Sequence, residues 1–232
     1  MPLDIDRIQA ICFDVDGTLS DTDDLWVDKF SKRFSFLKFV SPQRDVRILA
    51  RWLVMVLESP GNLVFEMFDR LTLDDEVARL YNWIAHRNAG RKPKHFWMVP
   101  QGLELLQFCH RRYPLSIVSA RDEASTHAFL EQFEIRGLFK TVVTAQTCAY
   151  TKPFPDPVLK AAAMKGIPPQ NCLMVGDTTV DIRAGKAAGA QTVGVLCGFG
   201  TEKELRRAGA DMILQNTHEL MDVLEEVDSF EI

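Results

Sequence analysis

The chain has 232 residues, of which 47% are hydrophobic and 25% are charged, as in most globular proteins. This length suits one large domain or two smaller ones, and the net charge of -5 argues against a general nucleic-acid-binding protein. The five cysteines are scattered and form no C-x-x-C pair, and the N-terminus lacks the apolar segment of a signal peptide. The most hydrophobic stretch, residues 52–57, is too short to span a bilayer. We therefore expect a cytoplasmic protein with reduced cysteines.

The first predicted strand covers residues 8–13 and is followed by two carboxylates one residue apart. The segment is mostly apolar and too short for a helix. If the strand continues through Asp16, the side chains of Asp14 and Asp16 face one spot at its C-terminal end, where open α/β sheets bind ligands. Two like charges this close need a cation or a shared proton. The alternative is that one carboxylate caps the next helix and the other is solvated.

Helical periodicity without a convincing strand extends from residue 20 to about residue 98. Trp26, Phe30 and Phe34 recur at helical spacing, and breaks occur at residues 59–62 and 88–90. We predict an all-helical domain over residues 20–98, inserted directly after the first strand. Because the apolar stretch 52–57 fits either the core of this domain or a dimer face, we expect a monomer or a homodimer.

From residue 99 onward, short apolar strands alternate with helices. The predicted strands cover residues 115–119, 141–144, 172–175, 191–196 and 212–214, and the predicted helices cover residues 103–112, 123–133, 157–165, 181–188, 202–207 and 218–227. Such alternation is typical of a parallel sheet covered on both faces. The predicted fold is therefore α/β: a doubly wound parallel-sheet core of residues 1–19 and 99–232 with the inserted helical domain.

Three further polar clusters follow predicted strands. Ser119 and Ala120 place a hydroxyl and backbone N–H groups at the end of one strand, although a lone serine there could be a helix N-cap. Lys152 lies among three prolines that restrict where its ammonium points, unless it is an ordinary surface lysine. Asp177 and Asp181 follow the strand at residues 172–175, where Asp177 could instead cap a helix.

Together these clusters supply the parts that phosphoryl transfer needs at one edge of the sheet. Carboxylate oxygens suit Mg²⁺, which prefers one or two carboxylates, waters and a substrate phosphate. Phosphoryl transfer also needs a nucleophile, a proton donor for the leaving oxygen and cations around the phosphoryl oxygens. Each part has a candidate here, and a carboxylate nucleophile would form an aspartyl-phosphate.

Four motifs together resemble the haloacid dehalogenase-like hydrolase superfamily. They are D-x-D-G-T at residues 14–18, the serine Ser119, K-P-x-P beginning at Lys152 and G-D-x-x-x-D at residues 176–181, and they occur in this order. The helical insertion and the segment 194–201 resemble the branch that contains phosphoglycolate phosphatase and β-phosphoglucomutase. The resemblance implies a Rossmann-like core with a helical cap.

The resemblance also implies a role for each motif residue. Asp14 would be the nucleophile, and Asp16 would be the general acid/base. The implied metal ligands are Asp14, Asp16 through its backbone carbonyl, and Asp177. Asp181 would support these ligands without touching the metal, or would contact the metal through a water. The implied phosphate-binding residues are Thr18, Ser119, Ala120 and Lys152, and Lys152 would also ease the repulsion between phosphate and nucleophile.

The expected function is Mg²⁺-dependent hydrolysis of a small phosphorylated metabolite, with no nucleic-acid or membrane partner. Asp16 argues against a dehalogenase, because members with that chemistry usually lack the second aspartate. A phosphomutase of the β-phosphoglucomutase type would share the whole core and stays open. A receiver-like, phospho-accepting signalling module is a non-enzyme alternative, but it lacks a large helical insertion and a D-x-D pair.

Overall fold

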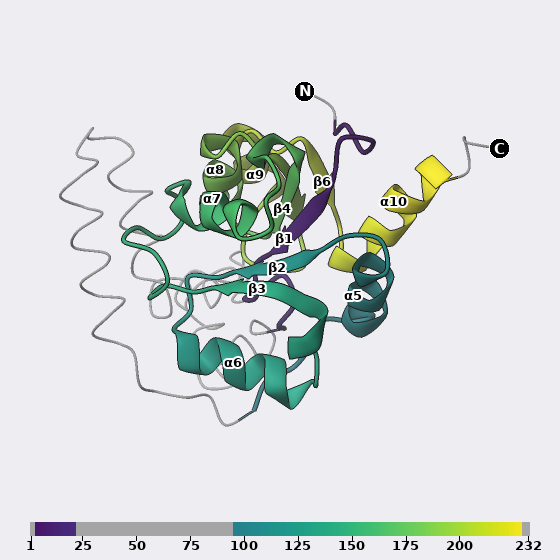
Figure 1. Ribbon diagram of the computed structural model, residues 1–232. Helices are drawn as coiled ribbons and strands as arrows, with labels where there is room; N and C mark the ends of the chain where they lie inside the picture. Colours follow the sequence, from purple (N-terminus) through teal and green to yellow (C-terminus); the bar gives the residue numbers. More distant parts are fainter. Residues whose placement is uncertain (1–2, 22–94, 229–232) are drawn as a thin grey trace, which may run out of the picture. The chain divides into compact units, whose positions relative to one another are not determined.

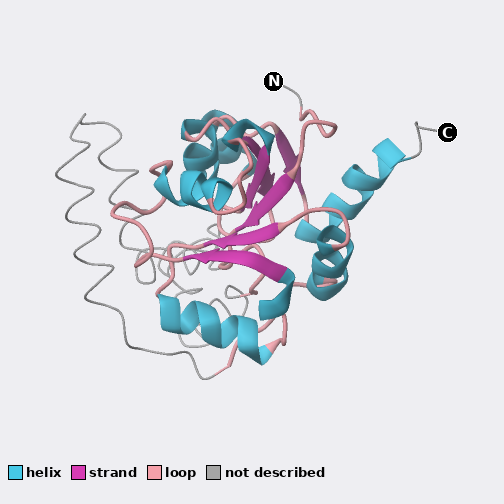
Figure 2. Cartoon of the chain, in the orientation of Figure 1, coloured by secondary structure: helices cyan, strands magenta, loops and turns pink. Residues whose placement is uncertain are grey.

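The computed structural model describes residues 3–21 and 95–228, which form a parallel sheet with helices on both faces (Figures 1 and 2). The sheet order is β3-β2-β1-β4-β5-β6, and every neighbouring pair is parallel. The strands are β1 (Ala10–Phe13), β2 (Leu115–Val118), β3 (Phe139–Val143), β4 (Cys172–Gly176), β5 (Gln191–Val195) and β6 (Met212–Leu214). The predicted doubly wound α/β core is confirmed. The predicted cap domain, residues 20–98, lies outside the described residues except at its two ends.

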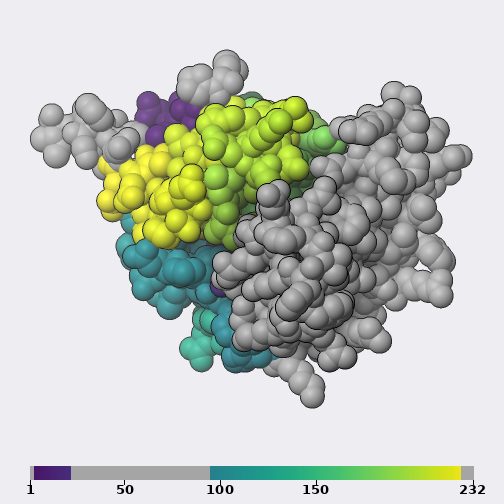
Figure 3. Space-filling model, turned by 180° about the vertical axis from the view of Figure 1, so that it is seen from behind, coloured from purple at the N-terminus to yellow at the C-terminus, as the bar shows by residue number. Residues whose placement is uncertain are grey.

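Helices connect successive strands and cover the two faces. They are α5 (Gly102–His110), α6 (Glu123–Gln132), α7 (Asp156–Ala163), α8 (Thr179–Ala187), α9 (Glu202–Ala208) and α10 (Leu220–Asp228), with 3-10 turns η2 (Arg136–Leu138), η3 (Pro169–Asn171) and η4 (Thr217–Glu219). Figure 1 shows α7, α8 and α9 on one face and α5, α6 and α10 on the other. In Figures 1 and 3, α10 lies beside α5. No described helix has the length and apolar character that a membrane span requires.

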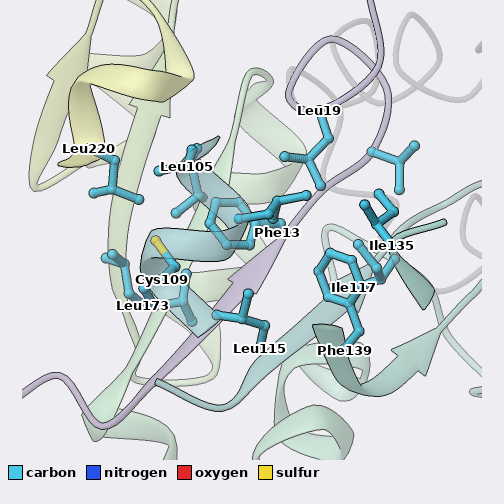
Figure 4. Close-up of a cluster of buried hydrophobic side chains, with 14 of the residues drawn as sticks. Phe13, Leu19, Leu105, Cys109, Leu115, Ile117, Ile135, Phe139, Leu173 and Leu220 are labelled. Atoms are coloured by element: carbon cyan, nitrogen blue, oxygen red, sulfur yellow. The ribbon is translucent and has the colours of Figure 1, made fainter. Parts of the chain in front are cut away.

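Strand β1 is buried on both faces because helices cover the sheet from both sides. Alternate side chains point to opposite faces, so Ile11 and Phe13 join the larger hydrophobic cluster with the residues of α5 and α6 (Figure 4). Ala10 and Cys12 join the second cluster, which contains residues of α7 and α8. The small side chains on this second face allow those helices to pack closely, and the buried strand holds the following loop in place.

The chain leaves the core after β1 and returns to it at residues 95–99. The N–H of Asp21 donates to the carbonyl of Trp97 at 2.9 Å, and the N–H of Val99 donates to that of Leu19 at 3.0 Å. Phe96 is buried and packs against Phe129, with ring centroids 5.8 Å apart. The outgoing and returning segments are therefore adjacent, as expected for an insertion into one loop of the core.

Candidate active site

The loops that follow β1, β2 and β4 meet at one edge of the sheet. Strand β1 lies between the other two, and Phe13 is in register with Ile117 on one side and Val175 on the other. The N–H of Asp14 donates to the carbonyl of Val175 at 2.9 Å, which continues the pairing one residue beyond the strand. Because parallel strands end at the same edge, motifs far apart in the sequence come together there.

Three buried carboxylates form the centre of this edge. Asp14, Asp177 and Asp181 each offer an oxygen, and these oxygens lie within 4.8 Å of one another. The Lys152 Nζ lies 2.7 Å from Asp14 Oδ1 and 2.5 Å from Asp181 Oδ1. Lys152 is itself buried, so it is not an ordinary surface lysine. The single ammonium balances only one of the three negative charges, which leaves an excess that a cation would neutralise.

Burial and charge shift the pKa values of the central pair in directions that the geometry explains. Burial raises the pKa of Asp14 to about 7; the Lys152 ammonium opposes this rise, and the carboxylates of Asp181 and Asp16 add to it. Burial alone would lower the pKa of Lys152, but Asp14 and Asp181 outweigh burial and raise this pKa above the usual lysine value. Lys152 is therefore a permanent cation beside the carboxylate of Asp14.

Asp181 has two sets of contacts: one with the start of α8 and one with Lys152. Its Oδ2 accepts hydrogen bonds from the N–H of Thr178 at 3.0 Å and from the Thr178 hydroxyl at 2.5 Å, while Oδ1 accepts from Lys152. Thr178 is the N-cap of α8, so the alternative that Asp177 caps this helix is wrong. Asp181 therefore orients Lys152 and anchors the start of α8.

Asp177 is oriented by two other loops. Its Oδ1 accepts a hydrogen bond from the Thr18 hydroxyl at 3.3 Å, and its Oδ2 accepts one from the N–H of Phe199 at 2.8 Å. A Cβ atom added at Gly17 or at Gly198 would overlap the Asp177 carboxylate. Sequence reasoning did not identify the loop around Phe199 as part of this site, although the glycines that flank Phe199 were a usable signal.

Asp14 and Asp16 have different surroundings. Strand β1 ends at Phe13, so the condition under which both carboxylates face one spot is not met. Gly17, with φ of 71°, begins the turn that takes the chain away from the strand direction. Asp16 instead pairs with Arg121, whose Nε donates to Asp16 Oδ2 at 3.0 Å and whose Nη2 donates to Oδ1. The D-x-D motif thus places one carboxylate in the buried cluster and the other at its rim.

Ser119 lies at the end of β2, buried next to β3. Its N–H donates to the carbonyl of Val143 at 2.9 Å, and its Oγ accepts from the N–H of Arg121 at 3.1 Å. The N-cap of α6 is Asp122, whose carboxylate accepts from the N–H of Ser125 at 2.9 Å, so Ser119 is not the N-cap. Ala120 is half-buried in the same loop.

The structure therefore brings the predicted site residues together in two linked groups. The first contains Asp14, Thr18, Lys152, Asp177 and Asp181, and the second contains Asp16, Ser119 and Ala120. Arg121 contacts both Asp16 and Ser119 of the second group. Sequence reasoning assigned no role to Arg121, because its contact with Asp16 spans 105 residues.

The chain is similar to known hydrolases in sequence and in fold. The family model for haloacid dehalogenase-like hydrolases matches residues 11–195. The chain is 29% identical over 220 residues to the pyrophosphatase PpaX of Anoxybacillus flavithermus, covering 94% of this chain and 97% of that protein. It is 34% identical over 111 residues to the phosphoglycolate phosphatase of Escherichia coli, covering 48% of this chain and 44% of that protein. A solved hydrolase from Pseudomonas syringae has a TM-score of 0.64 at 25% identity, covering 94% of this chain and 99% of that one.

Proposed function

The chain belongs to the haloacid dehalogenase-like hydrolase family, and on this basis we propose that it is a Mg²⁺-dependent phosphatase that hydrolyses a small phosphorylated metabolite. The observation that carries the proposal is the buried cluster of Asp14, Asp177 and Asp181 around Lys152. The proposal assigns residues 1–19 and 99–232 to the catalytic core and residues 20–98 to a helical cap that selects the substrate. It further holds that the protein works in the cytoplasm as a monomer or a homodimer.

The residues present fit a divalent cation. The donors are all oxygens, the buried cluster carries excess negative charge, and glycines leave room for the Asp177 carboxylate. In the proposal, the carboxylates of Asp14 and Asp177 and the backbone carbonyl of Asp16 hold Mg²⁺. When bound, Mg²⁺ would neutralise these carboxylates and polarise the phosphoryl oxygens.

In the first chemical step, the free Asp14 oxygen attacks the phosphorus of the substrate. A bond forms between that oxygen and phosphorus, the bond to the leaving oxygen breaks, and Asp16 donates its proton to the leaving oxygen. The products of this step are a free alcohol or acid and an aspartyl-phosphate on Asp14. The Lys152 ammonium, 2.7 Å from Asp14 Oδ1, lowers the repulsion between carboxylate and phosphate.

In the second step, a water attacks the aspartyl-phosphate. Asp16 accepts a proton from this water, inorganic phosphate leaves, and both Asp14 and Asp16 return to their starting states. In the proposal, Thr18, Ser119, Ala120 and Lys152 bind the phosphoryl oxygens in both steps, because they lie in the loops at the same edge of the sheet. The placement of Asp16 at the rim of the cluster suits a group that serves the leaving oxygen first and water second.

The related pyrophosphatase and phosphoglycolate phosphatase favour hydrolysis over a mutase reaction. A phosphomutase with the same core would transfer the phosphoryl group to a second hydroxyl instead of to water. Release of inorganic phosphate separates the two functions, because interconversion of isomeric sugar phosphates releases none.

The test is a phosphate-release assay on pyrophosphate, phosphoglycolate, sugar phosphates and nucleotides, with Mg²⁺ or with EDTA. We expect release only with Mg²⁺, and loss of at least about 1,000-fold in kcat for Asp14→Asn, because the covalent step needs this carboxylate. Asp222→Asn, an exposed aspartate of α10, is the matched control and should retain full activity. Full activity of Asp14→Asn would refute the mechanism, and isomerisation without phosphate release would favour the mutase.

A further inference from the structure

Arg121 contacts two of the candidate site residues at once. Its side chain holds Asp16 through two parallel hydrogen bonds, from Nε at 3.0 Å and from Nη2. Its backbone N–H donates to Ser119 Oγ at 3.1 Å, and its carbonyl accepts from the N–H of Ala145 at 3.1 Å. Because hydrogen bonds hold both the N–H and the carbonyl of Arg121, the backbone of this residue is fixed and its guanidinium is positioned beside Asp16.

The Arg121 side chain is largely buried. The side chain is only 10% exposed, and its Cζ lies 5.0 Å from the centroid of the Phe96 ring. Among the described residues, Nη1 is buried and has no hydrogen-bond partner. A buried donor without an acceptor is costly, and an arginine has five donors to satisfy. The pairing with Asp16 therefore leaves part of this guanidinium without an acceptor.

We propose that Arg121 binds the leaving-group side of the substrate through Nη1 while Nε and Nη2 orient Asp16. This inference rests on the proposed function, and it names the substrate class: phosphate esters or anhydrides whose leaving group carries its own anionic oxygens. Pyrophosphate and phosphorylated 2-hydroxy acids belong to this class, whereas phosphate esters of neutral alcohols do not.

The geometry that supports this class is the contact between Arg121 and the proposed general acid. Asp16 must reach the leaving oxygen to protonate it, so the atoms attached to that oxygen lie beside the residue that holds Asp16. In the proposal, an anionic oxygen one or two bonds beyond the leaving oxygen accepts a hydrogen bond from Nη1, the donor that the pairing with Asp16 leaves unsatisfied. Lys152 does not discriminate between these substrates, because every phosphoryl group brings the same negative oxygens to it. Discrimination therefore depends on the leaving group.

The test compares a matched pair of substrates, phosphoglycolate and 2-hydroxyethyl phosphate, which differ by one carboxylate, together with pyrophosphate. In Arg121→Gln we expect a loss of kcat for every substrate, because Asp16 is no longer oriented. We expect a further loss of about 10- to 100-fold in kcat/KM for pyrophosphate and phosphoglycolate alone, the size of a charged hydrogen bond. Arg121→Lys keeps the charge without the paired donors, so it should restore much of the preference and little of the kcat.

Arg112→Gln is the matched control. This arginine also lies over a phenylalanine ring, with its Cζ 3.9 Å from the Phe108 centroid, but it precedes β2 and so lies at the opposite edge of the sheet. The control should leave both kcat and the substrate preference unchanged. A melting curve for each variant separates a local effect from loss of folding.

Binding without turnover provides a second readout. In an Asp14→Asn background, calorimetry with Mg²⁺ should show that Arg121→Gln weakens pyrophosphate by about 10-fold or more and inorganic phosphate by less than about 3-fold. If Arg121→Gln lowered kcat/KM equally for pyrophosphate, phosphoglycolate and 2-hydroxyethyl phosphate, the proposal would be overturned. Arg121 would then be a positioning residue alone. Absence of Mg²⁺-dependent phosphate release by the unmodified protein would instead refute the proposed function.

Discussion

Replacing Asp177 by asparagine should stabilise the metal-free protein while destroying its affinity for Mg²⁺. The substitution keeps the shape of the side chain and its contacts, because the Thr18 hydroxyl can accept from the new amide and the N–H of Phe199 can still donate to an oxygen. What it removes is one of three negative charges from a buried cluster that holds a single lysine.

The magnitude follows from the distances. Two unit charges 4.8 Å apart, the upper limit of the separations in this cluster, repel by about 3.5 kcal/mol at an effective dielectric constant of about 20, and Asp177 has two neighbours within that limit. The lost attraction to Lys152 offsets part of this gain. The two hydrogen bonds of Asp177 also become neutral, which costs about 1 kcal/mol each. We expect a net gain of about 2 kcal/mol, or about 4–8 °C in Tm for a chain of this size.

The assay is thermal unfolding in EDTA and in 10 mM Mg²⁺ at pH 8, where Asp14 is ionised because its pKa is about 7. The unmodified protein should gain stability from Mg²⁺, by about 2.7 kcal/mol at a concentration 100 times the Kd. Asp177→Asn should begin from a higher Tm in EDTA and gain almost nothing from Mg²⁺. Asp222→Asn is the control for the charge change at an exposed site. An unchanged or lower Tm of Asp177→Asn in EDTA would refute the electrostatic reasoning.

Two other predictions concern Asp14 and the glycines. Because the pKa of Asp14 is raised to about 7 in the folded protein from about 4 when unfolded, the folded state binds the extra proton between these values, and metal-free stability should fall as pH rises through this window. Urea unfolding in EDTA at pH 5.5 and pH 7 should show a fall of about 2 kcal/mol that Asp14→Asn lacks; an equal fall in both proteins would contradict the assignment to Asp14. Gly198→Ala adds a methyl group that overlaps the Asp177 carboxylate, so the Kd for Mg²⁺ should rise about 10-fold or more, whereas Gly137→Ala meets no atom within 4 Å and should not change it. Calorimetric Mg²⁺ titration checks this, and equal Kd values for the two variants would exclude the steric argument.

Local sequence patterns predicted most elements of the core, because a short apolar run between turn residues is typical of a buried strand and is too short for most helices. Strand β6 matches its prediction, Met212–Leu214, at both ends. Strand β3 begins two residues before its predicted start, because Phe139 pairs with Leu115 across a register shift that no local pattern encodes. Helix α8 begins at Thr179, and its predicted start at Asp181 was late because the Thr178–Asp181 capping box was not used.

The chemistry of the candidate site is local to the motifs, but the partners of its residues are not. The D-x-D-G-T, K-P-x-P and G-D-x-x-x-D motifs carry the carboxylates, the lysine and the glycines wherever they lie in the chain. Which carboxylate faces Lys152 depends on the loops that meet beside β1, and the structure places Asp14 and Asp181 there. The sequence pattern alone treated Asp14 and Asp16 as a pair.

By itself, then, the sequence determined the α/β class, the family and a set of candidate site residues, because residue type and spacing decide these features locally. Only the tertiary structure decided the separation of Asp14 from Asp16. That separation depends on the end of β1 at Phe13, on the left-handed turn at Gly17 and on an arginine from the loop after β2. Strand order brings these distant segments together, and strand order arises from packing of the whole sheet rather than from any one motif.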